Sequence, residues 1–119
     1  MSQEYSEDLM HLDEQLLAEL QQLLGDDYPE LVETFLKDSA QRITDLETTI
    51  ESTVAEDVRH AAHSFKGSSL NMGALRLSEL CRQLEEMALN GRLFRATECL
   101  EHIKAEFEQV TAELQNNLK

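Results

Sequence analysis

The chain has 119 residues, of which 41% are hydrophobic and 29% are charged, so its length allows one domain with a single core and excludes two. Its 24 acidic and 10 basic side chains give a formal net charge of −14, which disfavours binding to nucleic acid or to an anionic membrane. No apolar run reaches the ~20 residues of a membrane span, and the N-terminus has no secretory signal, so we expect one cytoplasmic domain over residues 1–119.

Helical periodicity runs along the chain, whereas the alternation typical of strands is absent. Leucines three or four residues apart predict a short first helix over about 9–24, which Gly25 ends. Asp26 or Asp27 can cap the second helix, which tolerates Pro29 in its first turn and runs to about residue 51. The leucines with this spacing are Leu9, Leu12, Leu16, Leu20 and Leu23, with Leu17 and Leu24 beside them.

Three further helices are predicted over about 54–71, 75–89 and 92–117. The spacing of Thr53 and Glu56 is that of a capping box, which would open the first of them. Because the connections are short, successive helices should be antiparallel neighbours. The sequence therefore predicts an all-α fold, an antiparallel up-down four-helix bundle with an additional short N-terminal helix. Two cysteines lie on inner stripes, where small buried side chains are expected: Cys81 and Cys99.

Charge is distributed unevenly along the chain. Residues 1–57 hold 16 acidic and 2 basic side chains, a net of −14, whereas residues 58–95 hold 3 acidic and 6 basic ones, a net of +3. Residues 96–119 return to a net of −3, from 5 acidic and 2 basic side chains. The basic middle segment is either a chance fluctuation of surface charge or a local site for an anion or an acidic partner.

Gly67 is the only glycine inside a predicted helix, where glycine costs about 1 kcal/mol relative to alanine. His63, Lys66 and Gly67 stand at i, i+3 and i+4, so they share one helix face, away from the core stripe. An imidazole with a pKa of about 6.5 is largely neutral near pH 7, as a phosphoryl acceptor must be. Two interpretations remain open: phosphoryl acceptance by His63, or a close helix crossing at Gly67 beside an ordinary surface histidine.

The run His63-x-x-Lys66-Gly67-Ser68-Ser69-x-x-x-Gly73 resembles the signature of the histidine-containing phosphotransfer (HPt) domains of bacterial multi-step phosphorelays. The resemblance continues in register through four more residues: Leu77, Cys81, Leu84 and Glu85. Because the chain begins at Met1 and carries no kinase or receiver domain, a free-standing member of the family is expected.

The resemblance implies that His63 accepts and donates the phosphoryl group, that Lys66 stabilises it, and that Gly67 gives access to the histidine. Three residues would support the site: Ser68, Ser69 and Gly73. Some members of the family carry Gln at the position of Glu85, where it can assist near the phosphoryl group, and an ionised carboxylate cannot donate the hydrogen bond that an amide gives.

The partners that the resemblance implies are the receiver domains of hybrid sensor kinases and of response regulators. The Mg²⁺ would be supplied by the receiver, so we expect no cofactor bound by this chain, no metal site of its own, and neither nucleic acid nor membrane as a partner. No Gly-rich phosphate-binding loop is present, so intrinsic ATP-dependent kinase activity is not expected. We expect the receiver to dock on the second and third predicted helices, with contacts from Arg59, His60, Leu70 and Arg76.

Two other functions compete with the phosphoryl carrier. The same bundle could dock a receiver without transferring anything, although the joint presence of His63, Lys66 and Gly67 favours transfer. A phosphohistidine hydrolase ranks last, because no second acid or base is placed to activate water. The histidines and cysteines lack the spacing of a metal site, and no helix has a second apolar stripe, so a monomer is expected.

Overall fold

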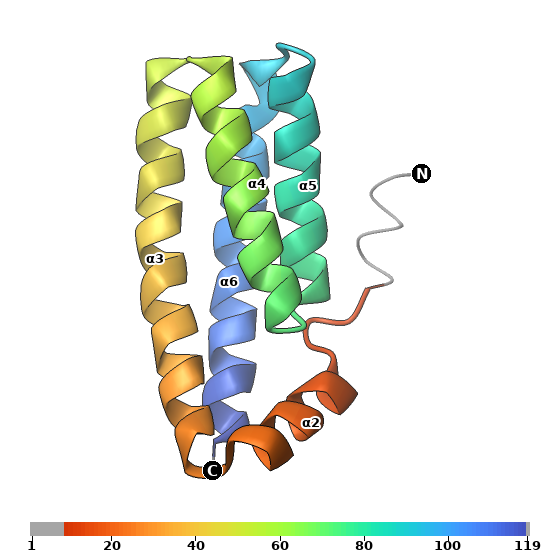
Figure 1. Cartoon of the computed structure of the whole chain (residues 1–119). Coiled ribbons are helices and arrows are strands. Elements are labelled where there is room, and N and C mark those ends of the chain that lie inside the picture. The colour runs from red at the N-terminus through yellow and green to blue at the C-terminus, as the bar shows by residue number, and fades with distance from the viewer. Residues whose placement is uncertain (1–8, 119) are drawn as a thin grey trace.

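The computed structural model describes residues 9–118, and this part of the chain is helical without any strand. The all-helical class is thus confirmed. The α-helices are α2 (Glu14–Leu24), α3 (Tyr28–Ser52), α4 (Ala55–Asn71), α5 (Leu75–Leu89) and α6 (Ala96–Asn117). Figure 1 shows α3, α4, α5 and α6 side by side, each running opposite to the one before it, with α2 lying across the end where α3 begins. Residues 1–8 and 119 of the predicted domain lie outside the described residues, and the single-domain organisation stays a prediction.

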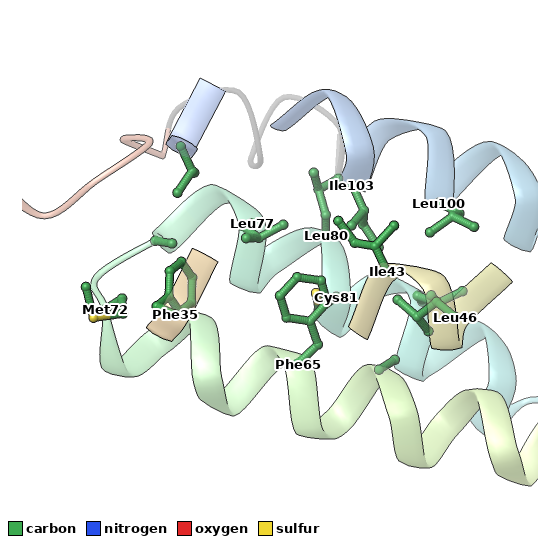
Figure 2. Close-up of a cluster of buried hydrophobic side chains, with 14 of the residues drawn as sticks. Phe35, Ile43, Leu46, Phe65, Met72, Leu77, Leu80, Cys81, Leu100 and Ile103 are labelled. Atoms are coloured by element: carbon green, nitrogen blue, oxygen red, sulfur yellow. The ribbon is translucent and has the colours of Figure 1, made fainter. Parts of the chain in front are cut away.

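The core is one cluster of buried apolar side chains to which every helix contributes. Figure 2 shows its centre, where Phe65 of α4 lies among side chains of the neighbouring helices. Cys81 and Cys99 are both free and buried, as predicted. None of the helices in the described range is long and apolar enough to cross a membrane.

The first helix begins later than predicted, because Asp13 caps it. The Asp13 carboxylate accepts the N–H of Leu16 at 3.1 Å, so the preceding residues 9–12 are not helical. Leu12 and Leu17 are buried, but Leu23, which continues the same leucine spacing, is 80% exposed. The physical reason is that α2 crosses the bundle end and buries only one narrow side, which the stripe through Leu17 occupies.

The junction between α3 and α4 also differs from the prediction. Thr53 has a φ of 60° and ends α3 in a left-handed conformation, and its hydroxyl donates to the carbonyl of Ser52. The N-cap of α4 is Val54, without a side-chain cap, so the predicted capping box is wrong. Likewise, Gly25–Asp27 form a 3-10 turn before α3, whose N-cap Asp27 makes no side-chain cap bond, and a 3-10 turn over Leu93–Arg95 delays the start of α6.

Candidate functional site

The candidate histidine lies on the solvent side of α4. The opposite side of this helix is buried in the bundle through Val58, Ala62 and Phe65, and this rotation turns the His63 face outward, as the spacing predicts. The side chain of His63 is 59% exposed, and that of Lys66 is 27% exposed. The two groups are therefore accessible from outside the bundle.

Glu85 of α5 joins these two side chains. Its Oε2 lies 2.7 Å from Nδ1 of His63, and its Oε1 lies 2.7 Å from Nζ of Lys66. Partial burial raises the pKa of Glu85, but the hydrogen bonds from Lys66 and His63 outweigh burial, so the net pKa lies below its ordinary value. Glu85 is thus a carboxylate near pH 7 and can only accept hydrogen bonds.

This contact determines which ring nitrogen of His63 is available. Because the Glu85 carboxylate accepts the Nδ1–H, the neutral ring carries its proton on Nδ1 and leaves a lone pair on Nε2. Nε2 is the nitrogen that can act as a nucleophile towards an approaching group. The histidine is therefore held in the tautomer that phosphoryl acceptance at the outer nitrogen requires.

The resemblance put the position of Glu85 near the phosphoryl group, but sequence reasoning did not predict that its carboxylate binds Nδ1 of His63. The signal was available in the register of the α4–α5 hairpin. His63 and Glu85 both lie 11 residues from Ala74, the residue at which the chain turns back. In an antiparallel helical hairpin, residues at equal distance from the turn lie at the same height, so the two side chains meet.

Gly67 is not required by packing within the chain. A Cβ atom built on Gly67 meets nothing within 4 Å, so the interpretation of a close helix crossing is wrong. The open space lies on the side of His63 and Lys66, one turn along an exposed surface. The remaining interpretation is that Gly67 leaves room for another molecule to approach this surface.

The three predicted supporting residues have different surroundings. Ser68 is partly buried, and Ser69 is fully buried on the core side of α4. Gly73 has a φ of +69°, and its carbonyl accepts the N–H of Asp13 at 2.8 Å. A Cβ atom at Gly73 would lie 3.0 Å from Cβ of Asp13 and 3.1 Å from Cδ2 of Leu16. Gly73 therefore supports the docking of the segment before α2 rather than the histidine itself.

Three of the predicted partner contacts lie on α4. Arg59 is paired with Glu56, through bonds of 2.8 and 2.6 Å from Nε and Nη2. His60 is exposed one turn before His63, and Leu70 is 50% exposed one turn after Gly67. Leu70 and His60 are thus open to a partner on the same helix as the candidate histidine.

The fourth predicted contact, Arg76, is engaged inside the chain. Its Nε and Nη2 donate to the carbonyl of Leu9 at 3.0 and 2.8 Å. Its backbone N–H donates to the carbonyl of Met10 at 3.2 Å. These bonds hold the segment before α2 against the start of α5, a structural role that sequence spacing did not indicate.

A groove of about 510 Å³ lies between α2, α3 and α4. Its apolar lining includes Leu20 and Phe35, and its polar lining includes Arg42, Ser64 and Ser68. Ser64 and Ser68 follow His63 and Gly67 in the chain, but Ser64 contacts Arg42 of α3 whereas His63 contacts Glu85 of α5, so the groove and the candidate site lie on different sides of α4. Within residues 9–118, no three His, Cys, Asp or Glu side chains gather where they could hold a metal ion.

Comparisons with a family model, with known sequences and with solved structures all point to the same family. Residues 30–113, which run from the first turn of α3 almost to the end of α6, match the Hpt domain family. The crystal structure of histidine-containing phosphotransfer protein B from Pseudomonas aeruginosa is 42% identical and has a TM-score of 0.87, with 90% of this chain and 93% of that chain covered. Histidine-containing phosphotransfer protein 2 of Arabidopsis thaliana is 28% identical over 112 residues, which are 88% of this chain and 71% of that protein. A maize histidine-containing phosphotransfer protein, 24% identical with a TM-score of 0.79 and covering 91% and 89% of the two chains, shares the fold.

Proposed function

This chain belongs to the Hpt domain family, and from that premise we propose that it is a phosphorelay carrier. His63 accepts a phosphoryl group from the aspartyl phosphate of a receiver domain, such as that of a hybrid sensor kinase, and passes it to the aspartate of a response regulator. The observation that carries this proposal is the 2.7 Å bond between Nδ1 of His63 and Glu85, which leaves Nε2 unprotonated on an exposed helix face.

The transfer step follows from this geometry. The Nε2 lone pair of His63 attacks phosphorus in line, the bond between phosphorus and the aspartate oxygen breaks, and the aspartate leaves as a carboxylate. No proton has to move, because Nδ1 keeps its proton on Glu85. The ring of the adduct then carries a positive charge, which the adjacent carboxylate neutralises. Transfer to the second receiver is the same displacement in reverse.

Lys66 and Gly67 have supporting roles in the proposal. The ammonium of Lys66 is bound to Glu85 at 2.7 Å, so it can turn between that carboxylate and the phosphoryl oxygens beside it. Gly67 leaves room for the receiver. Charge neutralisation by Mg²⁺ comes from the acidic pocket of the receiver, and this chain binds no cofactor.

The receiver docks, in this proposal, on the α3–α4 side of the bundle, around His63. His60 and Leu70 flank the histidine on α4 and are exposed, whereas Arg59 contacts the partner only if its pair with Glu56 opens. The protein works as a monomer in the cytoplasm, where it meets the receivers, and has neither nucleic acid nor membrane as a partner.

The test is phosphoryl transfer from a phosphorylated receiver domain with Mg²⁺, followed as acid-labile phosphate on this chain. Label is expected on the wild type and on His60→Gln, and none on His63→Gln. Label on the His63→Gln variant would show that another histidine is the acceptor. Binding of several receivers without label on any protein would instead support the competing function, a docking module that transfers nothing.

A further inference from the structure

The groove between α2, α3 and α4 contains one cation that has no counterion. Arg42 lies on α3 and lines the groove together with Ser64 and Ser68 of α4. Its Nη1 donates to Oγ of Ser64 at 2.5 Å. Within residues 9–118, its Nε is buried without a hydrogen-bond acceptor, and no carboxylate lies within ion-pair distance, although Asp38 lines the same groove one turn away.

This arrangement is unfavourable in the isolated chain. A buried donor without an acceptor costs about 1–3 kcal/mol, and more for a charged group. The cost disappears if the side chain turns so that Nε and Nη2 face an acceptor together. A carboxylate meets a guanidinium with two parallel bonds in this way, which neither a lysine nor an amide reproduces.

The distribution of charge along this part of the chain indicates what kind of molecule carries that acceptor. Residues 1–57 hold 16 acidic side chains and only two basic ones, Lys37 and Arg42. An acidic group approaching α3 is repelled along most of the helix and is attracted at Arg42. A protein domain that sits over His63 and extends across α4 towards α3 reaches the groove, whose lining includes the apolar side chains Leu20 and Phe35.

We propose that Arg42 determines specificity for the receiver domain, by pairing with an acidic side chain that the receiver inserts into the groove between α2, α3 and α4. The inference rests on the proposed function, since the receiver is its occupant. Arg42 does not touch the transferred group. It selects and positions the partner, and receivers without an acidic side chain at this contact are bound more weakly.

The experiment measures binding and transfer separately, with a receiver domain that labels the wild type. Arg42→Gln is expected to weaken binding in calorimetry by about 10- to 100-fold and to raise KM, while the transfer rate at saturating receiver stays the same. The matched control is Lys37→Gln, which removes the other cation of residues 1–57 from an exposed position of the same helix and should bind as the wild type does. Equal affinities of the two variants would overturn the proposal.

A charge swap identifies the acceptor on the receiver. Each Asp and Glu on the docking face of the receiver is changed to Arg in turn and is tested against wild type and Arg42→Glu. One pair should recover affinity, with a coupling that no other pair shows. No recovery in any pair overturns the proposal, even if Arg42→Gln alone binds weakly because its fold is perturbed.

Two further readouts separate this proposal from its alternatives. Sedimentation that shows a wild-type dimer and a monomeric Arg42→Gln variant would assign the groove to a second copy of this chain and overturn the receiver contact. Calorimetry with the unphosphorylated receiver compares wild type and Arg42→Gln without any transfer, so a failure of transfer leaves the effect of Arg42 on binding measurable.

Discussion

Oε2 of Glu85 lies 2.7 Å from Nδ1 of His63, so the candidate nucleophile on α4 is oriented by a carboxylate of the neighbouring helix α5. Only 17% of the Glu85 side chain is exposed, against 59% for His63. The fixed partner is therefore the carboxylate, and the imidazole projects from it towards the solvent. The chemistry of the exposed ring depends on a residue that a partner cannot easily reach.

Replacement of Glu85 should change transfer according to which property is lost. Glu85→Gln keeps an amide oxygen that accepts the Nδ1–H of His63, but it loses the negative charge that neutralises the ring after transfer. Glu85→Ala loses both. We expect transfer at saturating receiver to be slower in Glu85→Gln and slower again in Glu85→Ala, by about tenfold or more overall. Nitrogen NMR of His63 provides the matching readout, since the proton should stay on Nδ1 in the Gln variant and become shared between the nitrogens in the Ala variant. An Ala variant with wild-type rate and tautomer would refute the role of Glu85.

The ionisation of Glu85 also makes part of the stability dependent on pH. The pKa of Glu85 is lowered in the folded chain, from an ordinary value of 4.5. A carboxyl whose pKa is lowered by folding adds stability above its unfolded pKa and loses it as the pH falls through its folded pKa. Urea unfolding should therefore show a difference between wild type and Glu85→Gln that shrinks as the pH falls below about pH 4.5. Its size should stay within about 1 kcal/mol, as for pairs near the surface. A difference that grows as the pH falls from about 4.5 to 3 would contradict the assignment.

The parts of this site that sequence predicted are those fixed by local geometry. His63, Lys66 and Gly67 share a face because helical spacing places them there, whatever the rest of the fold does. The contact between Glu85 and His63 depends on the register between α4 and α5, and the spacing of residues along one helix cannot predict it. The predicted capping box is absent for a related reason. Thr53 ends α3 in a left-handed conformation, so it does not occupy the N-cap position of α4.

Sequence reasoning also did not predict which side chains make contacts with distant parts of the chain. A positive charge near the histidine predicted a partner contact at Arg76, but its guanidinium binds the carbonyl of Leu9. Leu23 fitted an apolar stripe, yet it is exposed because α2 has only a bundle end to pack against. Helix periodicity predicts which side chains share a face, and the contact area that the neighbours offer decides how much of that face is buried.

Two substitutions at Gly67 separate folding from access. Gly67→Ala should raise the free energy of unfolding by about 1 kcal/mol, because glycine is unfavourable inside a helix and the added Cβ meets nothing. Gly67→Gln should fold as well as the wild type but block transfer, because its longer side chain fills the space that the receiver needs. Urea unfolding and the transfer assay measure the two effects. Normal transfer in the Gln variant would remove the steric explanation of Gly67.

The two thiols should be unreactive in the folded protein. Burial raises the pKa of Cys99 to about 11 and also raises that of Cys81, so about one Cys99 in a thousand is a thiolate at pH 8. Ellman's reagent should label neither thiol in buffer within the time that free cysteine reacts, and both in concentrated urea. A Cys99→Ala variant keeps only the Cys81 thiol, so the difference in labelling between this variant and the wild type in urea gives the labelling of Cys99. Rapid labelling of one thiol without urea would show that α5 and α6 separate locally.

Gly73 should be the glycine whose replacement costs the most stability, and Gly91 offers a matched control. Both have positive φ, +69° and +67°, so alanine at either position adds about 1–2 kcal/mol of backbone strain. Only at Gly73 does the new Cβ also come within 3.0 Å of the Asp13 Cβ, which forces the segment before α2 away from the α4–α5 turn. Gly73→Ala should therefore lose more stability in urea than Gly91→Ala, by about 1 kcal/mol or more. It should also lose the hydrogen bond from the Asp13 N–H to the carbonyl of residue 73.

Hydrogen exchange at the Asp13 N–H measures that bond directly. The exchange should become faster in Gly73→Ala and stay slow in Gly91→Ala. Equal losses in the two variants would mean that backbone strain alone accounts for Gly73, and that the segment before α2 yields without cost.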